Sequence, residues 1–153
     1  MKKKIALSLI LLIIASVSLY AWINRVNYDV YGTISDVESN PMEGVDFKID
    51  ASRKNGSLYI ENNSNRYIVI DLSRKRVQIE IHKEDGWHRL VAHNLAYAEP
   101  CAIPEKSTYS LDFTWRNFVD GPLKPGKYRA TLFFGDGMSE IYTYSVTTEF
   151  FID

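Results

Sequence analysis

The chain has 153 residues, 46% of them hydrophobic and 13% aromatic, with a formal net charge of −1. This length and hydrophobic content suffice for one packed domain with a short appendage and exclude a mainly disordered protein. Of the 18 basic residues, three are lysines at the amino end, and the remaining 15 stand against 19 acidic residues. The resulting net charge of −4 excludes nucleic acid and anionic lipid headgroups as main partners.

The amino end has the features of an export signal. Lys2, Lys3 and Lys4 precede an uncharged, mostly apolar stretch over residues 5–23. At about 1.5 Å rise per residue, a helix over about 19 residues covers close to the ~30 Å of bilayer hydrocarbon. Because positive charge resists translocation, the lysines stay in the cytoplasm. We therefore predict that residues 1–23 form an apolar signal-anchor helix, with a single pass and the C-terminal domain outside the cell membrane.

The same stretch permits cleavage instead of anchoring. Ser16 and Ser18 occupy the small-residue positions that a signal peptidase needs for a cut after Ser18. The alternative location is therefore secretion after signal cleavage. A lipid anchor is not expected, because the single cysteine, Cys101, does not follow the apolar run.

Residues 24–44 contain Gly32 and Pro41 among scattered charges, and we expect them to form a stalk or linker. The domain proper is predicted to cover residues 45–153. It starts with an alternation typical of a strand with one face in a core, in which three apolar residues, Val45, Phe47 and Ile49, are separated by polar ones.

The same alternation recurs downstream, and turn residues separate the segments that carry it. About seven strands result, spaced as an antiparallel β-sandwich requires. The tyrosines, phenylalanines and β-branched residues support this all-β fold, because their side chains suit pleated surfaces. Asp85-Gly86 is a tight-turn signal, which predicts a hairpin that pairs Glu84 with Trp87 and His82 with Arg89.

Three pieces of this domain carry a resemblance: Leu58-Tyr59-Ile60-Glu61-Asn62-Asn63-Ser64, Ile81-His82-Lys83-Glu84-Asp85-Gly86-Trp87, and Asp112-Phe113-Thr114-Trp115 followed by Gly121-Pro122-Leu123-Lys124-Pro125-Gly126-Lys127-Tyr128-Arg129. Together they resemble the bacterial immunoglobulin-like domains of exported Gram-positive proteins, over roughly residues 45–152. The resemblance implies an immunoglobulin-like β-sandwich in an extracytoplasmic setting. It implies no catalytic or ligand-binding residues.

The order of an Asn-x-Ser turn, a Gly-Trp hairpin and a Pro-Gly-x-Tyr strand is also similar to a bacterial intracellular proteinase-inhibitor family. This similarity implies an alternative function, inhibition of a proteinase by an extended loop. Residues 94–107, stiffened by Pro100 and Pro104, are the segment that would serve as that loop.

No residues are assigned to catalysis, to a cofactor or to a metal. The predicted hairpin places His82 and His88 on opposite faces, so these histidines do not share an ion. No serine lies in a Gly-x-Ser-x-Gly context, and no glycine-rich loop precedes a helix. We therefore expect a protein that is not an enzyme.

Aromatic residues are the remaining candidates for binding. Trp115 is in phase with Leu111 and Phe113, which predicts a buried tryptophan. Trp87, beside the turn, either packs over the hairpin end or contacts a partner. The same two alternatives apply to Tyr97, which lies in the irregular stretch of residues 94–104.

Cys101 excludes an internal disulfide and is either a small buried hydrophobe or part of an intermolecular bridge. The sequence as a whole thus predicts a non-enzymatic, membrane-tethered interaction or structural module. Its partner is an envelope protein or a cell-wall component of unknown identity.

Overall fold

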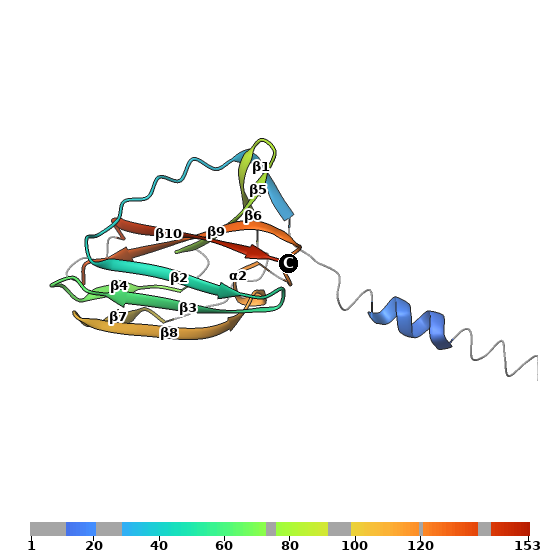
Figure 1. Cartoon of the computed structure of the whole chain (residues 1–153), viewed down its shortest axis with the longest axis horizontal. Helices are drawn as coiled ribbons and strands as arrows, with labels where there is room; N and C mark the ends of the chain where they lie inside the picture. The colour runs from blue at the N-terminus through green and yellow to red at the C-terminus, as the bar shows by residue number, and fades with distance from the viewer. Residues whose placement is uncertain (1–11, 21–28, 73–75, 92–98, 120, 138–141) are drawn as a thin grey trace, which may run out of the picture.

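The computed structural model describes residues 12–20, 29–72, 76–91, 99–119, 121–137 and 142–153 (Figure 1). Within these residues, two antiparallel β-sheets pack against each other, which confirms the predicted all-β sandwich. Residues 12–20 form a helix, and the remainder of the predicted span over residues 5–23 lies outside the described residues. Among the described helices, none combines the length and the apolar character that crossing a membrane requires.

The large sheet has seven strands. Its order is β1 (Asp29–Ile34), β6 (Gly86–Val91), β5 (Val77–Lys83), β9 (Gly126–Gly135), β4 (Ile68–Ile70) and β7 (Cys101–Ile103), and β10 (Tyr144–Ile152) pairs with β9. The small sheet has the order β2 (Val45–Ala51), β3 (Asn55–Asn62) and β8 (Ser107–Thr114), followed by the short helix α2 (Arg116–Val119). The described residues thus form more than the seven or so strands expected, because β4 and β7 have only three residues each and are too short to show an alternating pattern.

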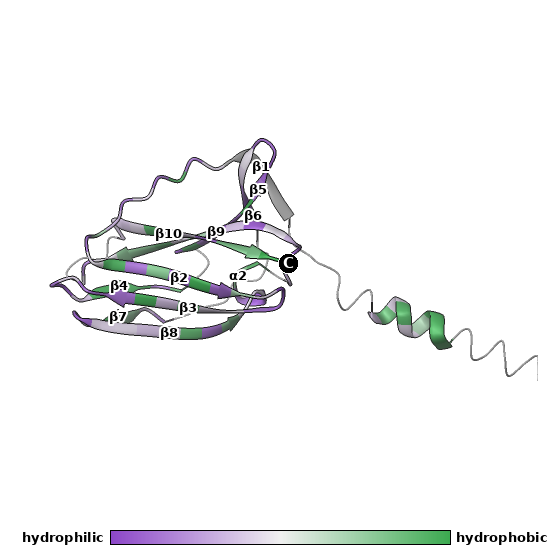
Figure 2. Cartoon of the chain, viewed as in Figure 1, coloured by the Kyte–Doolittle hydropathy of each residue, from purple (hydrophilic) through white to green (hydrophobic). Residues whose placement is uncertain are grey.

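The core lies between the two sheets and contains the inward side chains of both. Hydrophobic and hydrophilic residues alternate along β2 and β3, as Figure 2 shows, and Val45, Phe47, Leu58 and Ile60 are buried. Trp115 is fully buried, as predicted, and its ring stacks on Phe150 with the centroids 5.4 Å apart. Its indole Nε1 donates a hydrogen bond to the carbonyl oxygen of Ser52 at 2.7 Å. Trp115 therefore links the two sheets just beyond the end of β8.

Part of the segment that we expected to act as a stalk belongs to the large sheet. β1 pairs antiparallel with β6, and residues 35–40 then run from β6 to the start of β10 (Figure 1). At one end of this crossing segment, the amide of Ser35 donates to the carbonyl of Trp87 at 2.7 Å. At the other end, the amide of Asn40 donates to Oγ of Ser145 at 2.8 Å.

The register of the β5–β6 hairpin differs from the prediction. His82 pairs with Trp87 and Lys83 pairs with Gly86, so the two turn residues are Glu84 and Asp85. Gly86 has a φ of 134°, which glycine adopts without strain, and it serves as the first residue of β6 and not as part of the turn. The predicted pairing of His82 with Arg89 is therefore wrong by two positions.

The conclusion that His82 and His88 lie on opposite faces nevertheless holds. His88 pairs with Ile81, the neighbour of His82, and successive side chains of a strand point to opposite faces. His88 is buried, and its Nε2 lies 2.7 Å from Oδ1 of Asp85 in the turn. This contact ties the turn to the following strand.

Candidate functional site

The outer face of the large sheet, turned away from the small sheet, carries two rows of side chains that run across four strands. The strand registers place His82 opposite Trp87, and Lys127 opposite Phe151. These four residues form the row that we call the aromatic row. The second row lies two residues away from the aromatic row along each strand, on the same face of the sheet. We call it the charged row, and it contains Arg89, Glu80, Arg129 and Glu149.

The aromatic row holds a lysine between two aromatic rings. The Nζ of Lys127 lies 5.3 Å from the centroid of the Trp87 ring and 6.0 Å from that of Phe151. Trp87 is half-buried, and its ring meets the ring of His82 edge to face, with centroids 4.9 Å apart. Phe151 is 68% exposed, although it lies in a strand of the sandwich. The row therefore presents an apolar ring to solvent beside a cation.

The charged row supports the aromatic row. Glu80 is fully buried, and its carboxylate accepts hydrogen bonds from Nε of Arg129 and from Nε2 of Gln78, the latter at 3.1 Å. The guanidinium carbon of Arg129 lies 4.7 Å from the centroid of the Trp87 ring. Because Glu80 fixes Arg129 and Arg129 packs on Trp87, the indole ring is held in one orientation.

Lys127 is also held by an acidic partner. Its Nζ lies 2.7 Å from Oε2 of Glu149 in the charged row. Both side chains are partly exposed, so this ion pair orients the ammonium group more than it stabilises the fold. The aromatic row is thus preorganised, and its exposed and half-buried rings, Phe151 and Trp87, are of the residue types that are enriched at the centres of protein interfaces.

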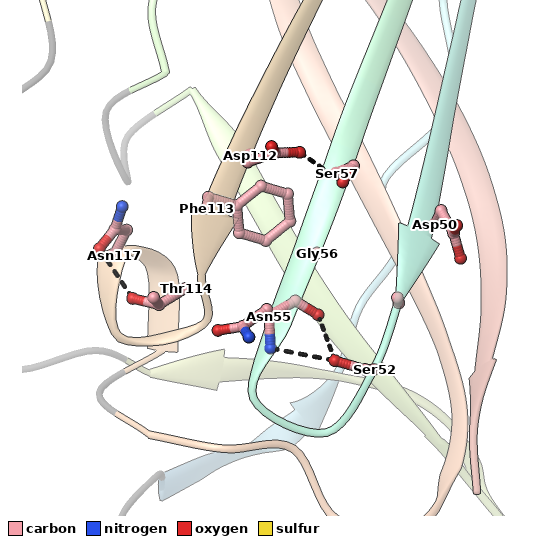
Figure 3. A pocket seen from close by; sticks show the side chains of 10 residues that line it. Asp50, Ser52, Asn55, Gly56, Ser57, Asp112, Phe113, Thr114 and Asn117 are labelled. Atoms are coloured by element: carbon pink, nitrogen blue, oxygen red, sulfur yellow. Dashed lines mark hydrogen bonds between the residues drawn. The ribbon is translucent and has the colours of Figure 1, made fainter.

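A second surface feature is an open polar hollow at the end of the small sheet, with a volume of about 620 Å³. Figure 3 shows the side chains of Asp112 and Ser57 directed toward each other, and Oγ of Ser57 donates to Oδ1 of Asp112 at 2.6 Å. Thr114 and Asn117 are joined in the same way at 3.2 Å. These polar groups satisfy one another, and the hollow offers no aromatic ring for stacking, since Phe113 is buried.

Of the two residues predicted to contact a partner, only Trp87 lies within the described part of the chain. It is in the aromatic row, and Tyr97 lies outside the described residues. Lys127 and Phe151 were not predicted from the sequence. The sequence contains a signal for Phe151, which lies between Phe150 and Ile152. Because successive side chains of a strand point to opposite faces, burial of these two neighbours places Phe151 on the outer face. Its position beside Lys127 depends on strand order, which the local pattern does not show.

The described residues contain no group of three or more His, Cys, Asp or Glu side chains arranged to hold a metal ion. His93 lies outside them, as do residues 94–98 of the segment considered as an inhibitory loop. Within that segment, Cys101–Ile103 forms β7 and pairs with β4. Cys101 is half-buried and packs against the core.

Comparison with known proteins adds no assignment to this geometry. No protein-family model matches the sequence, and a search of curated proteins found no match.

Proposed function

We propose that this chain is a non-enzymatic recognition module of the bacterial cell envelope, and that its aromatic row binds another envelope protein. In this proposal the sandwich is immunoglobulin-like, residues 1–23 anchor it in the membrane, and the domain lies outside. The observation that carries the binding role is the position of Lys127 between the rings of Trp87 and Phe151, with Phe151 68% exposed.

A protein partner fits this surface better than a cell-wall sugar. A sugar ring binds an aromatic residue by stacking on its open face, whereas two cations, Arg129 and Lys127, already lie over the Trp87 ring. The row combines aromatic residues with cations and has the acidic Glu149 at its margin. Trp and Phe are enriched at the centres of protein–protein interfaces, and charged groups such as Lys127 and Glu149 are typical of their polar rim.

Photocrosslinking in intact source cells tests the proposal. A photoreactive amino acid replaces Phe151 in the full-length protein, and a matched variant carries it at Tyr59, which is 49% exposed on the small sheet. We expect one discrete protein adduct from position 151 and none from position 59. Equal adducts at both positions, or only cell-wall fragments at position 151, would contradict a protein-binding aromatic row.

Two substitutions then separate the binding role from the fold. Lys127→Gln removes the cation but keeps a side chain of similar length, and we expect it to reduce the adduct at least about fivefold, with an unchanged melting temperature. Lys48→Gln, an equivalent change on the exposed face of β2, is the control and should leave the adduct unchanged.

The location is tested by the intact mass of the protein in the membrane fraction. An anchored chain keeps the full mass of 17.6 kDa. A smaller product that starts at Leu19, recovered from the medium, would show secretion after cleavage.

A further inference from the structure

The free edges of the two sheets differ in how they are protected against pairing with another strand. The register of β1 with β6 shifts between Val30 and Ile34. β7 has only three residues. β2 carries the charged residues Asp46, Lys48 and Asp50 on its exposed face. It lies against β10, which among the described strands pairs only with β9 and is a further edge strand of the large sheet, so these two edges lie beside each other. Irregular pairing, short length and charge are the usual means by which proteins protect sheet edges.

β8 is the least protected of these edges. Its eight residues pair with Asn55–Asn62 of β3 without a break in register. Asp112 is its single charged residue, and it contains no proline, glycine or lysine. In the described part of the chain no strand pairs with its other side. Every second residue of an edge strand directs its amide and carbonyl away from the sheet, so β8 offers a row of backbone hydrogen-bonding groups.

The side chains on the inner face of β8 are incompletely covered. Tyr109 pairs with Ile60 and Leu111 pairs with Leu58, and both partners in β3 are almost fully buried. Leu111 is nevertheless 37% exposed and Tyr109 is half-buried. They lie at the edge of the core, where a further strand in the same sheet would cover them.

The sequence of β8 is complementary to itself. In an antiparallel pair of two copies centred on Ser110, Tyr109 lies opposite Leu111 of the second copy, and Thr108 lies opposite Asp112 of the second copy. Both pairs keep inner residues against inner residues and outer residues against outer ones, which strand pairing requires. The carboxylate faces a hydroxyl and not its own copy, so no like charges meet.

We propose that β8 is a dimerisation edge, at which two copies of this chain pair their β8 strands antiparallel and join two three-stranded sheets into one six-stranded sheet. This contact is isologous, as in most homodimers. It uses the edge of the small sheet and leaves the aromatic row of the large sheet open, so the two sites are independent.

Disulfide trapping tests the pairing in the full-length protein in source-cell membranes, with Cys101 replaced by serine. In the centred register, Ser110→Cys places two thiols on directly opposed residues, with Cα atoms about 4.5–5.5 Å apart, within the range that a disulfide spans. Thr114→Cys, on the same strand, places them about 27 Å apart, since eight residues at ~3.4 Å separate them. Lys48→Cys is a control on the protected edge.

We expect mild oxidation to give at least about tenfold more covalent dimer from Ser110→Cys than from Thr114→Cys or Lys48→Cys, because only opposed residues meet the geometric limits of a disulfide. Equal yields from the three variants would overturn the proposal. An adduct of Ser110→Cys with a different protein would also overturn it, because the edge would then belong to another partner.

A second measurement does not depend on the engineered thiols. Leu111→Lys places a charge on the inner face of the edge, opposite Tyr109 of the second copy, and should convert a dimer of the detergent-solubilised chain into a monomer in sedimentation. Because Leu111 is partly exposed, the variant should keep its β-sheet circular dichroism spectrum. A wild-type chain that sediments as a monomer, or a folded variant that stays dimeric, would contradict the proposal.

Discussion

The buried carboxylate of Glu80 in β5 accepts a hydrogen bond from Nε of Arg129 in the neighbouring strand β9. Glu80 has no exposed surface, and the side chain of Arg129 is 15% exposed. A buried charge is tolerated only when it is paired and hydrogen-bonded, and Gln78 completes the hydrogen bonding of Glu80. The pair therefore fixes the centre of the large sheet and, through Arg129, the ring of Trp87.

Replacing one member of this pair should be costly. Glu80→Gln leaves the guanidinium of Arg129 without its counter-ion, and we expect a loss of about 3–5 kcal/mol in the free energy of unfolding, measured by urea denaturation. Glu149→Gln is the matched control, because it breaks the partly exposed pair with Lys127 and should cost at most about 1 kcal/mol. Similar losses in both variants would show that breaking the Glu80–Arg129 pair costs no more than breaking an exposed ion pair.

The two described tryptophans should respond differently to truncation. Trp115→Ala removes a fully buried ring and its hydrogen bond to Ser52, so a loss of about 3–5 kcal/mol in the free energy of unfolding is expected. Trp87→Ala removes a half-buried ring and should lower the free energy of unfolding by about 1 kcal/mol. In the protein that carries the photoreactive residue at position 151, the same substitution should abolish the crosslinked adduct. The measurements are chemical denaturation and the crosslinking yield. A large loss of stability in Trp87→Ala would assign that ring to the fold alone.

Gly56 is constrained by the ring of Phe113. A Cβ atom at position 56 would lie 2.6 Å from Cζ of that ring and 3.2 Å from the carbonyl oxygen of Asp50. Gly56→Ala should therefore lower the free energy of unfolding by about 1–3 kcal/mol. In a Phe113→Leu background the same substitution should cost less, because the ring that it clashes with is absent. A double-mutant cycle by urea denaturation measures this difference, and additive losses would argue against the contact.

Asp85 should make stability depend on pH in the acid range. The hydrogen bond from His88 lowers the pKa of the Asp85 carboxyl below its ordinary value of 3.8, with smaller contributions from the charges of His88 and Lys83. Folding thus favours the ionised carboxylate. Its contribution is complete above pH 3.8 and is lost as the pH falls through the lowered pKa of the folded state.

Asp85→Asn should accordingly melt at a lower temperature than the wild type near neutral pH, because it lacks the carboxylate. The difference should shrink at pH values below the ordinary carboxyl pKa, where the wild-type group becomes protonated. Thermal denaturation at the two pH values measures it. A difference of equal size at both would show that His88 does not favour the ionised form.

The strands could be predicted from the sequence where the signal is local. The alternation of Val45, Phe47 and Ile49, and that of Leu111 and Phe113, depends only on residues two positions apart, and it identified β2 and β8. The burial of Trp115 was predicted because it continues the alternation of Leu111 and Phe113, although β8 ends at Thr114 and Trp115 lies just beyond it.

The aromatic row could not be predicted because it depends on strand order. β9 lies between β5 and β10, which brings Lys127 and Phe151 together with His82 from three separate parts of the chain. Glu80 illustrates the same limit. A glutamate between the apolar Ile79 and Ile81 is typical of a solvent-facing position, whereas Glu80 is fully buried and bonded to Arg129 and Gln78.

The crossing segment has a consequence for how the chain is made. Ser39 and Asn40 bond to Ser145 across 106 and 105 positions of the sequence. Contacts of such long range form late and slow the folding of a domain. A nascent chain that has not yet emerged beyond Ser145 lacks β10 and the partner of Asn40. The crossing segment therefore cannot form these hydrogen bonds until the last strand is available. The domain is therefore completed only once β10 has emerged, and a ribosome stalled before that point should hold it in an open, protease-sensitive state.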